Sequence, residues 1–277
     1  MADKMADKIV ADNETAAAFS EFHVEADGFR IRYMAAGQGT PLIHLHGAGG
    51  PRLSRGLDLL SQHYRVIALE MPGFGRSAEN TRTTTMPDLA ATIASALTAM
   101  QIDRYNLLGT SFGGKVALWL AVQQPERVLG LVLEAPAAIR PVGTRPPAGT
   151  PEDLARRLYA HPERLPPLPA TDPAIQAKTS ALVMRLRGPD RDAVLEAEMR
   201  KLTTPTLVLF GTRDNVIPPE MGRCYKEVMP HCHLVFVYAA GHAISTERPE
   251  AFADVTIDFL ERHEAFVINR TPTVIHP

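Results

Sequence analysis

Short apolar runs alternate with longer amphipathic stretches along most of this chain. Six of the runs share an apolar composition and an end at glycine or proline: 41–47, 64–73, 105–109, 127–136, 206–211 and 233–241. Continuously apolar strands are typical of a sheet that is covered on both faces. Helical patterns lie between them, at 86–100, 112–124, 219–229 and 248–264. This alternation predicts an α/β fold with a mostly parallel, doubly wound sheet.

The beginning of the pattern differs from the rest. Residues 29–37 alternate between apolar and polar positions, as a half-exposed strand does, and no helical pattern separates them from the residues before. We therefore expect an antiparallel hairpin over about 19–36 at one edge of the sheet.

The alternation stops between about 136 and 200. Eleven of the 23 prolines fall in 136–189, which excludes an interior strand or a long helix there. Modest helical stretches remain near 151–160, 173–187 and 190–201, and their apolar residues favour folding over the alternative of a long disordered loop. We predict a proline-rich helical cap, 137–201, inserted over one end of the sheet.

The cap divides the predicted core into two segments, 19–136 and 202–264. The polar residues 1–18 are expected to be a disordered N-terminal segment. A C-terminal tail, 265–277, carries β-rich runs suited to packing on the body of the protein or on another subunit. A homo-oligomer is therefore one of the arrangements that the sequence allows.

The composition is that of an ordinary globular protein, with 45% apolar and 22% charged residues. A formal net charge of −2 gives no indication of a nucleic-acid or anionic-membrane partner. The N-terminus lacks the apolar core of a secretory signal, and no run approaches the roughly 20 apolar residues of a membrane-spanning helix. We expect a cytoplasmic protein in which Cys224 and Cys232 are reduced thiols.

One turn combines a buried strand, a serine and a helix, in the sequence "YNLLGTSFGGKVALWLA" from Tyr105 to Ala121. A sharp strand–turn–helix connection exposes Ser111 at the carboxyl end of the sheet, where an adjacent base can activate its hydroxyl. The backbone doubles back there, so the positions two before and two after must lack side chains. Gly109 and Gly113 meet this requirement. We predict that Ser111 is a nucleophile.

A base and an orienting carboxylate follow in the order that the serine needs. His242 follows a strand and opens a loop before a helix, and Asp214 follows another strand end. Loops at the carboxyl ends of parallel strands converge on one rim of the sheet. We predict His242 as the base and Asp214 as the acid, with Glu134 as a rival for the acid. His231 and His233 flank Cys232, but neighbouring strand residues point to opposite faces, so we predict no metal site.

The glycine-rich turn 45–50, "LHGAGG", also follows a strand. Its small residues allow main-chain N–H groups to approach a developing oxyanion, so we predict Ala48 and Phe112 as the oxyanion-hole donors. The turn lacks the spacing of a dinucleotide fingerprint and any following Lys-Ser/Thr, which argues against a phosphate-bearing cofactor. We expect no cofactor.

With these motifs in order, the chain resembles α/β-hydrolase-fold proteins of the esterase, lactonase and C–C hydrolase group over about 20–264. Five segments carry the resemblance: "HGAGG" at 46–50, "EMPGFGRS" at 70–77, "GTSFGG" at 109–114, "GTRDNVIP" at 211–218 and "GHAISTERPEAF" at 241–252. The resemblance implies an eight-stranded sheet with the cap inserted after the sixth strand. It also implies the same triad and oxyanion donors.

The departures from the family pattern narrow the chemistry. Glu70 stands at a turn position where family members usually carry Asp. Haloalkane dehalogenases and epoxide hydrolases need an aspartate nucleophile, so Ser111 excludes both. Hydrolases of aromatic ring-cleavage products often have "GPG" after the His-Gly turn and tryptophan after the catalytic histidine, whereas this chain has "AGG" and Ala243.

The expected function is that of a serine carboxylic ester hydrolase acting on a small-molecule ester or lactone through an acyl-enzyme. The first alternative is hydrolysis of a C–C bond in a diketone-like ring-cleavage product, for which the cap has to supply a cation. Five cap arginines are candidates: Arg156, Arg157, Arg185, Arg187 and Arg191. A low-turnover ligand-binding receptor and transfer to an alcohol or thiol acceptor are further alternatives.

Overall fold

The computed structural model describes residues 19–145, 148–266 and 274–275. The disorder expected for residues 1–18, and most of the predicted tail, lie outside these residues.

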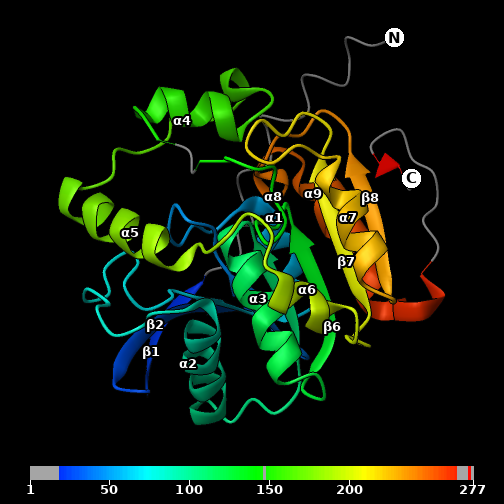
Figure 1. Cartoon of the computed structure of the whole chain (residues 1–277), viewed down its shortest axis with the longest axis horizontal. Helices are drawn as coiled ribbons and strands as arrows, with labels where there is room; N and C mark the ends of the chain where they lie inside the picture. Colours follow the sequence, from blue (N-terminus) through cyan, green and yellow to red (C-terminus); the bar gives the residue numbers. More distant parts are fainter. Residues whose placement is uncertain (1–18, 146–147, 267–273, 276–277) are drawn as a thin grey trace.

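One twisted sheet forms the centre of the molecule (Figure 1). The strand order is β1-β2-β4-β3-β5-β6-β7-β8-β9, with β3 to β8 parallel and β1, β2 and β9 antiparallel to their neighbours. The bounds are β1 (Ser20–Ala26), β2 (Phe29–Ala36), β3 (Pro41–Leu45), β4 (Arg65–Leu69), β5 (Tyr105–Thr110), β6 (Val128–Glu134), β7 (Thr206–Gly211), β8 (Cys232–Val237) and β9 (Val274–Ile275).

The eight strands expected from the sequence are all present, and the first two form the expected hairpin edge. The ninth strand, β9, comes from the C-terminal tail and pairs with β8. An edge strand exposes unpaired N–H and C=O groups, so this pairing covers part of the β8 edge.

Helices cover both faces of the sheet, as a doubly wound fold requires. On one face α2 (Met86–Ala99) packs against α3 (Phe112–Gln123), and α7 (Met221–Val228) lies over β7 and β8. On the other face α1 (Arg55–Leu60) packs against α8 (Ile244–Glu247) and α9 (Pro249–Arg262). Each face buries its own apolar cluster.

The longer core helices match the predicted patterns because their sequences carry start and stop signals. Helix α2 begins at a capping box in which Thr85 and Asp88 satisfy each other's backbone N–H groups. Helices α1 and α8 were not predicted, since six and four residues are too few to show a 3.6-residue period.

The segment between β6 and β7 folds into α4 (Pro151–Leu158), α5 (Pro173–Leu186) and α6 (Ala193–Met199). Figure 1 shows α4 beyond the arrowheads of the strands, above their carboxyl ends. Leu195 and Met199 of α6 join the same core cluster as α3, so α6 packs on the body of the protein.

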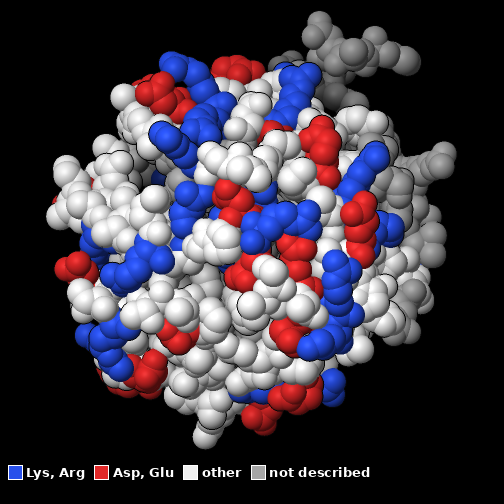
Figure 2. All heavy atoms as spheres, viewed as in Figure 1, with Lys and Arg blue, Asp and Glu red and all other residues white. Residues whose placement is uncertain are grey.

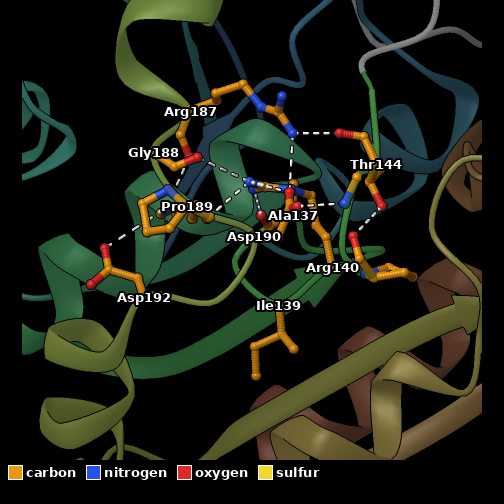
Figure 3. Close-up of polar contacts among 12 residues, drawn as sticks. Ala137, Ile139, Arg140, Thr144, Arg187, Gly188, Pro189, Asp190 and Asp192 are labelled. Atoms are coloured by element: carbon orange, nitrogen blue, oxygen red, sulfur yellow. Dashed lines mark hydrogen bonds and ion pairs between the residues drawn. The ribbon is translucent and has the colours of Figure 1, made fainter.

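The two ends of this segment are joined by charged groups that are buried or partly buried (Figure 3). Asp190 Oδ1 lies 3.2 Å from Arg140 Nε and 3.1 Å from an Arg187 guanidinium nitrogen. Asp190 Oδ2 accepts the Gly143 N–H at 2.8 Å, and Lys115 of α3 donates to the Arg187 carbonyl at 3.0 Å. The start and the end of the cap segment are therefore fixed to each other and to the helix that follows Ser111.

Positive and negative side chains are interspersed over the face of the molecule shown in Figure 2. Cys224 and Cys232 are both free thiols. No helix among the described residues is long and apolar enough to cross a membrane.

Candidate active site

Ser111 lies between β5 and α3 in a backbone conformation that L-residues rarely adopt, with φ 53° and ψ −112°. Its N–H donates to the Glu134 carbonyl at 2.9 Å, and its carbonyl accepts the Ala137 N–H at 2.9 Å. These bonds to the end of β6 hold the turn in place. The strain is of the kind that concentrates at functional sites.

The glycines of the turn are required by close backbone approach. A Cβ on Gly113 would lie 2.1 Å from the Leu45 carbonyl oxygen, and one on Gly109 would lie 2.6 Å from the Gly113 carbonyl oxygen. Real Cβ atoms do not come so close to backbone atoms. Gly113 is therefore required by the contact of α3 with the end of β3, and Gly109 by its own contact with α3.

The structure brings Asp214 and His242 together. His242 Nδ1 lies 2.8 Å from Asp214 Oδ2, and both side chains are buried. The other carboxylate oxygen accepts the N–H groups of Val216 and Ile217 at 2.8 and 2.9 Å. Because Asp214 accepts all three bonds, Nδ1 carries the proton and Nε2 keeps a lone pair, as a base needs. Among the described residues, no hydrogen bond joins His242 to the Ser111 hydroxyl.

Glu134, the rival for the acid, has other partners. It accepts the N–H of Ser245 and the hydroxyl of Thr110, each at 2.7 Å. The carboxylate that His242 contacts is therefore that of Asp214, and the role of Asp214 as the acid stays a prediction.

The glycine-rich turn lies directly beside the serine. A Cβ on Gly47 would lie 3.5 Å from the Ser111 Cβ. The turn closes through a hydrogen bond from the Gly50 N–H to the Gly47 carbonyl. Within the described part of the chain, the N–H groups of Ala48 and Phe112 have no acceptor. Both N–H groups are therefore free to bind an oxyanion. Their role as oxyanion-hole donors stays a prediction.

His46, at the start of this turn, orders the surrounding loops. Its Nδ1 lies 2.8 Å from the Gly47 carbonyl oxygen, and its Nε2 accepts the Met71 N–H at 3.2 Å. Burial lowers the pKa of His46 to about 4, so the ring is neutral at pH 7. Its ring packs edge-on against Phe74, which in turn contacts Phe112.

Glu70 fixes the next loop. Its carboxylate binds Arg32 at 2.8 Å and accepts both the N–H and the hydroxyl of Ser77, at 2.8 and 2.7 Å. Gly75 approaches so closely that a Cβ there would meet the Glu70 carboxylate at 2.4 Å. Glu70 therefore stabilises this turn, at the turn position that the resemblance to the family indicated.

Four of the five candidate cap arginines bind carbonyl or carboxylate groups of the protein. Arg185 donates to backbone carbonyls of the core loop at Asn80 and Thr83, which fixes α5 to the body. The other engaged arginines bind carboxylates: Arg156 with Asp153, Arg187 with Asp190 and Arg191 with Glu196. Arg157 has no polar partner among the described residues.

Sequence reasoning did not single out Arg52. It follows the glycine-rich turn, is exposed, and lines a pocket of about 120 Å³ together with His46 and Leu53. The pKa of the Tyr159 hydroxyl, in the cap segment, is raised by burial, and the nearby positive charge of Arg52 counteracts part of that rise. In the sequence, the position of Arg52 directly after the glycine-rich turn could have indicated a role at the site. No group of three or more His, Cys, Asp or Glu suited to a metal occurs in the described ranges.

The doubly wound sheet and a site built from a serine turn, a buried Asp–His pair and free backbone donors define a hydrolase of the α/β class. Comparison with known proteins agrees. A family model described as "Alpha/beta hydrolase family" matches residues 42–255. The chain belongs to this family.

Three similar proteins illustrate its range. The 2-hydroxymuconate semialdehyde hydrolase of Pseudomonas putida is 31% identical, over 87% of this chain and 94% of its own. The pimeloyl-[acyl-carrier protein] methyl ester esterase of Yersinia enterocolitica is 27% identical, over 80% of this chain and 93% of its own. The crystal structure of a serine hydrolase involved in carbazole degradation has a TM-score of 0.76 and 29% identity, over 88% of this chain and 99% of that one.

Proposed function

We propose that this protein hydrolyses a carbon–carbon bond next to a carbonyl group, in a diketone-like dienoate of the kind that aromatic ring cleavage produces. The observation that carries the proposal is the similarity over 87% of the chain to a 2-hydroxymuconate semialdehyde hydrolase. This reverses the order expected from the sequence, in which ester or lactone hydrolysis came first.

The site supports a serine mechanism for this reaction. His242 takes the Ser111 proton, Ser111 Oγ attacks the carbonyl carbon, and the N–H groups of Ala48 and Phe112 hold the oxyanion. The C–C bond then breaks, and its electron pair delocalises into the conjugated dienoate. The leaving carbon receives the proton held by His242. Water hydrolyses the acyl-enzyme, releasing a carboxylic acid and restoring the serine.

The dienoate carries a carboxylate, which needs a cation in the site. Arg157, which precedes Leu158 at the end of α4, has no polar partner among the described residues, and the Leu158 carbonyl accepts the His242 N–H. Arg52 lies close enough to Tyr159, one residue further on, for its charge to counteract part of the rise that burial causes in the pKa of that hydroxyl. We propose Arg157 and Arg52 as the carboxylate-binding cations.

Ester hydrolysis is the second candidate, and Ala243 favours it. The ring-cleavage hydrolases that this chain resembles often carry tryptophan after the histidine, whereas this chain has only a methyl group at that position. The same nucleophile, base and oxyanion donors serve both reactions, because both pass through a tetrahedral intermediate and an acyl-enzyme.

A direct comparison of substrates tests the proposal. Wild-type protein is assayed with 2-hydroxy-6-oxo-dienoates, followed by loss of the dienoate absorbance, and with p-nitrophenyl acetate. We expect kcat/KM for a dienoate to exceed that for the ester at least about tenfold, and Ser111→Ala to abolish both activities. An ester preference of the same size would establish the second candidate instead.

Arginine variants then test carboxylate recognition. Arg157→Gln and Arg52→Gln should each raise KM for the dienoate about tenfold and leave KM for the uncharged ester unchanged. Arg156→Gln is the matched control, since Arg156 lies on the same helix and is paired with Asp153. Equal effects of Arg157→Gln and Arg156→Gln would exclude Arg157 as a binding cation.

A further inference from the structure

The carboxyl of Glu134 is buried beside the predicted triad, and the proposed reaction makes no use of it. Glu134 is the last residue of β6 and is 1% exposed. Val132, two residues earlier, belongs to the apolar cluster under α1 and α9. Side chains two apart on a strand share a face, so the Glu134 carboxyl lies on that side of the sheet too.

Its two oxygens bind different parts of the predicted site. Oε2 accepts the hydroxyl of Thr110, and Oε1 accepts the N–H of Ser245, both at 2.7 Å. Thr110 directly precedes the predicted nucleophile, and Ser245 follows the predicted base by three residues. One carboxyl therefore joins the strand that carries Ser111 to the loop that carries His242.

His44 extends this arrangement below the serine. Its Nε2 lies 3.3 Å from the Thr110 Oγ1. Burial lowers the pKa of His44 to about 3, so the ring is neutral, with one nitrogen protonated. Since the single Thr110 hydroxyl proton is directed to Glu134, Thr110 Oγ1 accepts the proton of His44 Nε2. The donors run in one direction, from His44 through Thr110 to Glu134.

A buried carboxyl costs free energy unless hydrogen bonds compensate for lost solvation. Here burial raises the pKa of Glu134, and the bonds from Ser245 and Thr110 counteract part of that rise. An apolar side chain would fill the same space without this cost. What an apolar side chain cannot do is hold the Ser245 N–H and the Thr110 hydroxyl at once.

We propose that Glu134 is a positioning residue that sets the separation between Ser111 and His242. It acts by bridging Thr110 and Ser245, and its effect on the reaction passes through the placement of the base. The assignment rests on the proposed serine mechanism but applies equally to C–C and ester substrates.

The test uses a fluorophosphonate, which labels an activated serine without knowledge of the substrate. Inactivation of the full chain is followed at several probe concentrations to separate kinact from KI. Glu134→Ala removes the bridge, and Thr110→Val breaks it from the other end while keeping the side-chain volume. Both should lower kinact about 10- to 100-fold, the loss expected for a displaced base, and leave KI within about twofold.

Glu134→Gln is the conservative variant. Its amide oxygen still accepts the Ser245 N–H, and its amide N–H still reaches Thr110 Oγ1, so kinact should stay within about threefold of wild type. Glu70→Gln is the control for loss of a buried carboxylate elsewhere. It should lower the Tm, because an amide has only one acceptor oxygen and cannot bind both Arg32 and Ser77, and it should keep kinact near wild type.

The outcomes separate the two proposals. Wild-type kinact in Thr110→Val would overturn the bridge, whether or not Glu134→Ala folds well enough to be measured. A Glu134→Gln variant as slow as Glu134→Ala would also overturn it, since charge and not the bridge would then matter. A wild-type protein that does not label at Ser111 overturns the serine mechanism itself, and this assignment with it.

Discussion

The backbone N–H of His242 donates a 2.8 Å hydrogen bond to the carbonyl of Leu158, the last residue of α4. The loop that carries the predicted base is thus bonded directly to the cap segment. Glu247 strengthens this junction, because its carboxylate accepts the Gly241 N–H at 2.6 Å and the His161 N–H at 3.0 Å. The placement of His242 therefore depends on contacts with the end of α4 and the residues that follow it.

We expect Glu247→Ala to raise KM about three- to tenfold and to lower the free energy of unfolding by about 1–3 kcal/mol, because two backbone N–H groups lose their acceptor. Steady-state kinetics and urea unfolding measure the two effects. Glu250→Ala, at an exposed position in the first turn of α9, is the control and should change neither. Equal KM values in the two variants would show that this junction does not affect substrate binding.

The contact between α3 and the end of β3 gives a prediction about stability. A Cβ at position 113 would lie 2.1 Å from the Leu45 carbonyl oxygen and 2.5 Å from that of His46, and neither backbone atom can give way cheaply. Gly113→Ala should therefore cost about 3 kcal/mol or more in denaturant unfolding. Gly49→Ala, where a Cβ would have no neighbour within 4 Å, should stay within about 0.5 kcal/mol of wild type. Similar losses in both variants would contradict the steric explanation.

The sheet and the Asp214–His242 pair could be predicted because each depends on a local signal. Apolar runs that end at glycine or proline locate the strands, and parallel strands bring their carboxyl ends to one rim. The partners of buried polar groups could not be predicted in this way. From the sequence, Glu134 was only an alternative to Asp214 as the acid. Nothing near it in the sequence specifies Thr110 or Ser245 as its partners.

Lys115 is a second example of the same limit. It falls within an apolar helical pattern, and the sequence contains no sign that residues 187–192 return to cover it. The Arg187 carbonyl and the Asp192 carboxylate, 3.0 and 3.8 Å from Nζ, come from the far end of the cap segment. Long-range pairing of this kind depends on how the cap packs, and the proline-rich sequence leaves that open.

Asp190 predicts an acid-dependent contribution to stability. Burial alone would raise the pKa of its carboxyl, but the Gly143 N–H and the Arg140 and Arg187 guanidinium groups lower it overall. A carboxyl whose pKa is lower in the folded state stabilises the fold at neutral pH and loses that contribution as the pH falls through the folded-state pKa. The Tm difference between wild type and Asp190→Asn should thus be largest near pH 7 and shrink below about pH 4. A difference independent of pH would contradict this assignment.

Lys115 predicts the opposite pH dependence. It is 1% exposed, and burial, helped by the nearby Arg140 charge, lowers the pKa of its ammonium group to about 8. An unfolded lysine titrates near 10.4, so between about pH 8 and 10.4 the unfolded chain binds more protons, and stability rises with pH. Lys115→Met removes this titration and replaces a buried charge with an apolar chain of similar length.

The expected result is a change in relative stability. From pH 7 to pH 10 the free energy of unfolding of wild type should increase relative to Lys115→Met, by roughly 3 kcal/mol at most. Urea unfolding at pH 7, 8, 9 and 10 measures it, and Lys201→Met, at an exposed lysine paired with Glu198, is the control that should run parallel to wild type. If Lys115→Met also ran parallel, Lys115 would keep its ordinary protonation in the fold. The Lys115 ammonium group, which joins α3 to the cap segment, would then be solvated well enough not to destabilise the folded state.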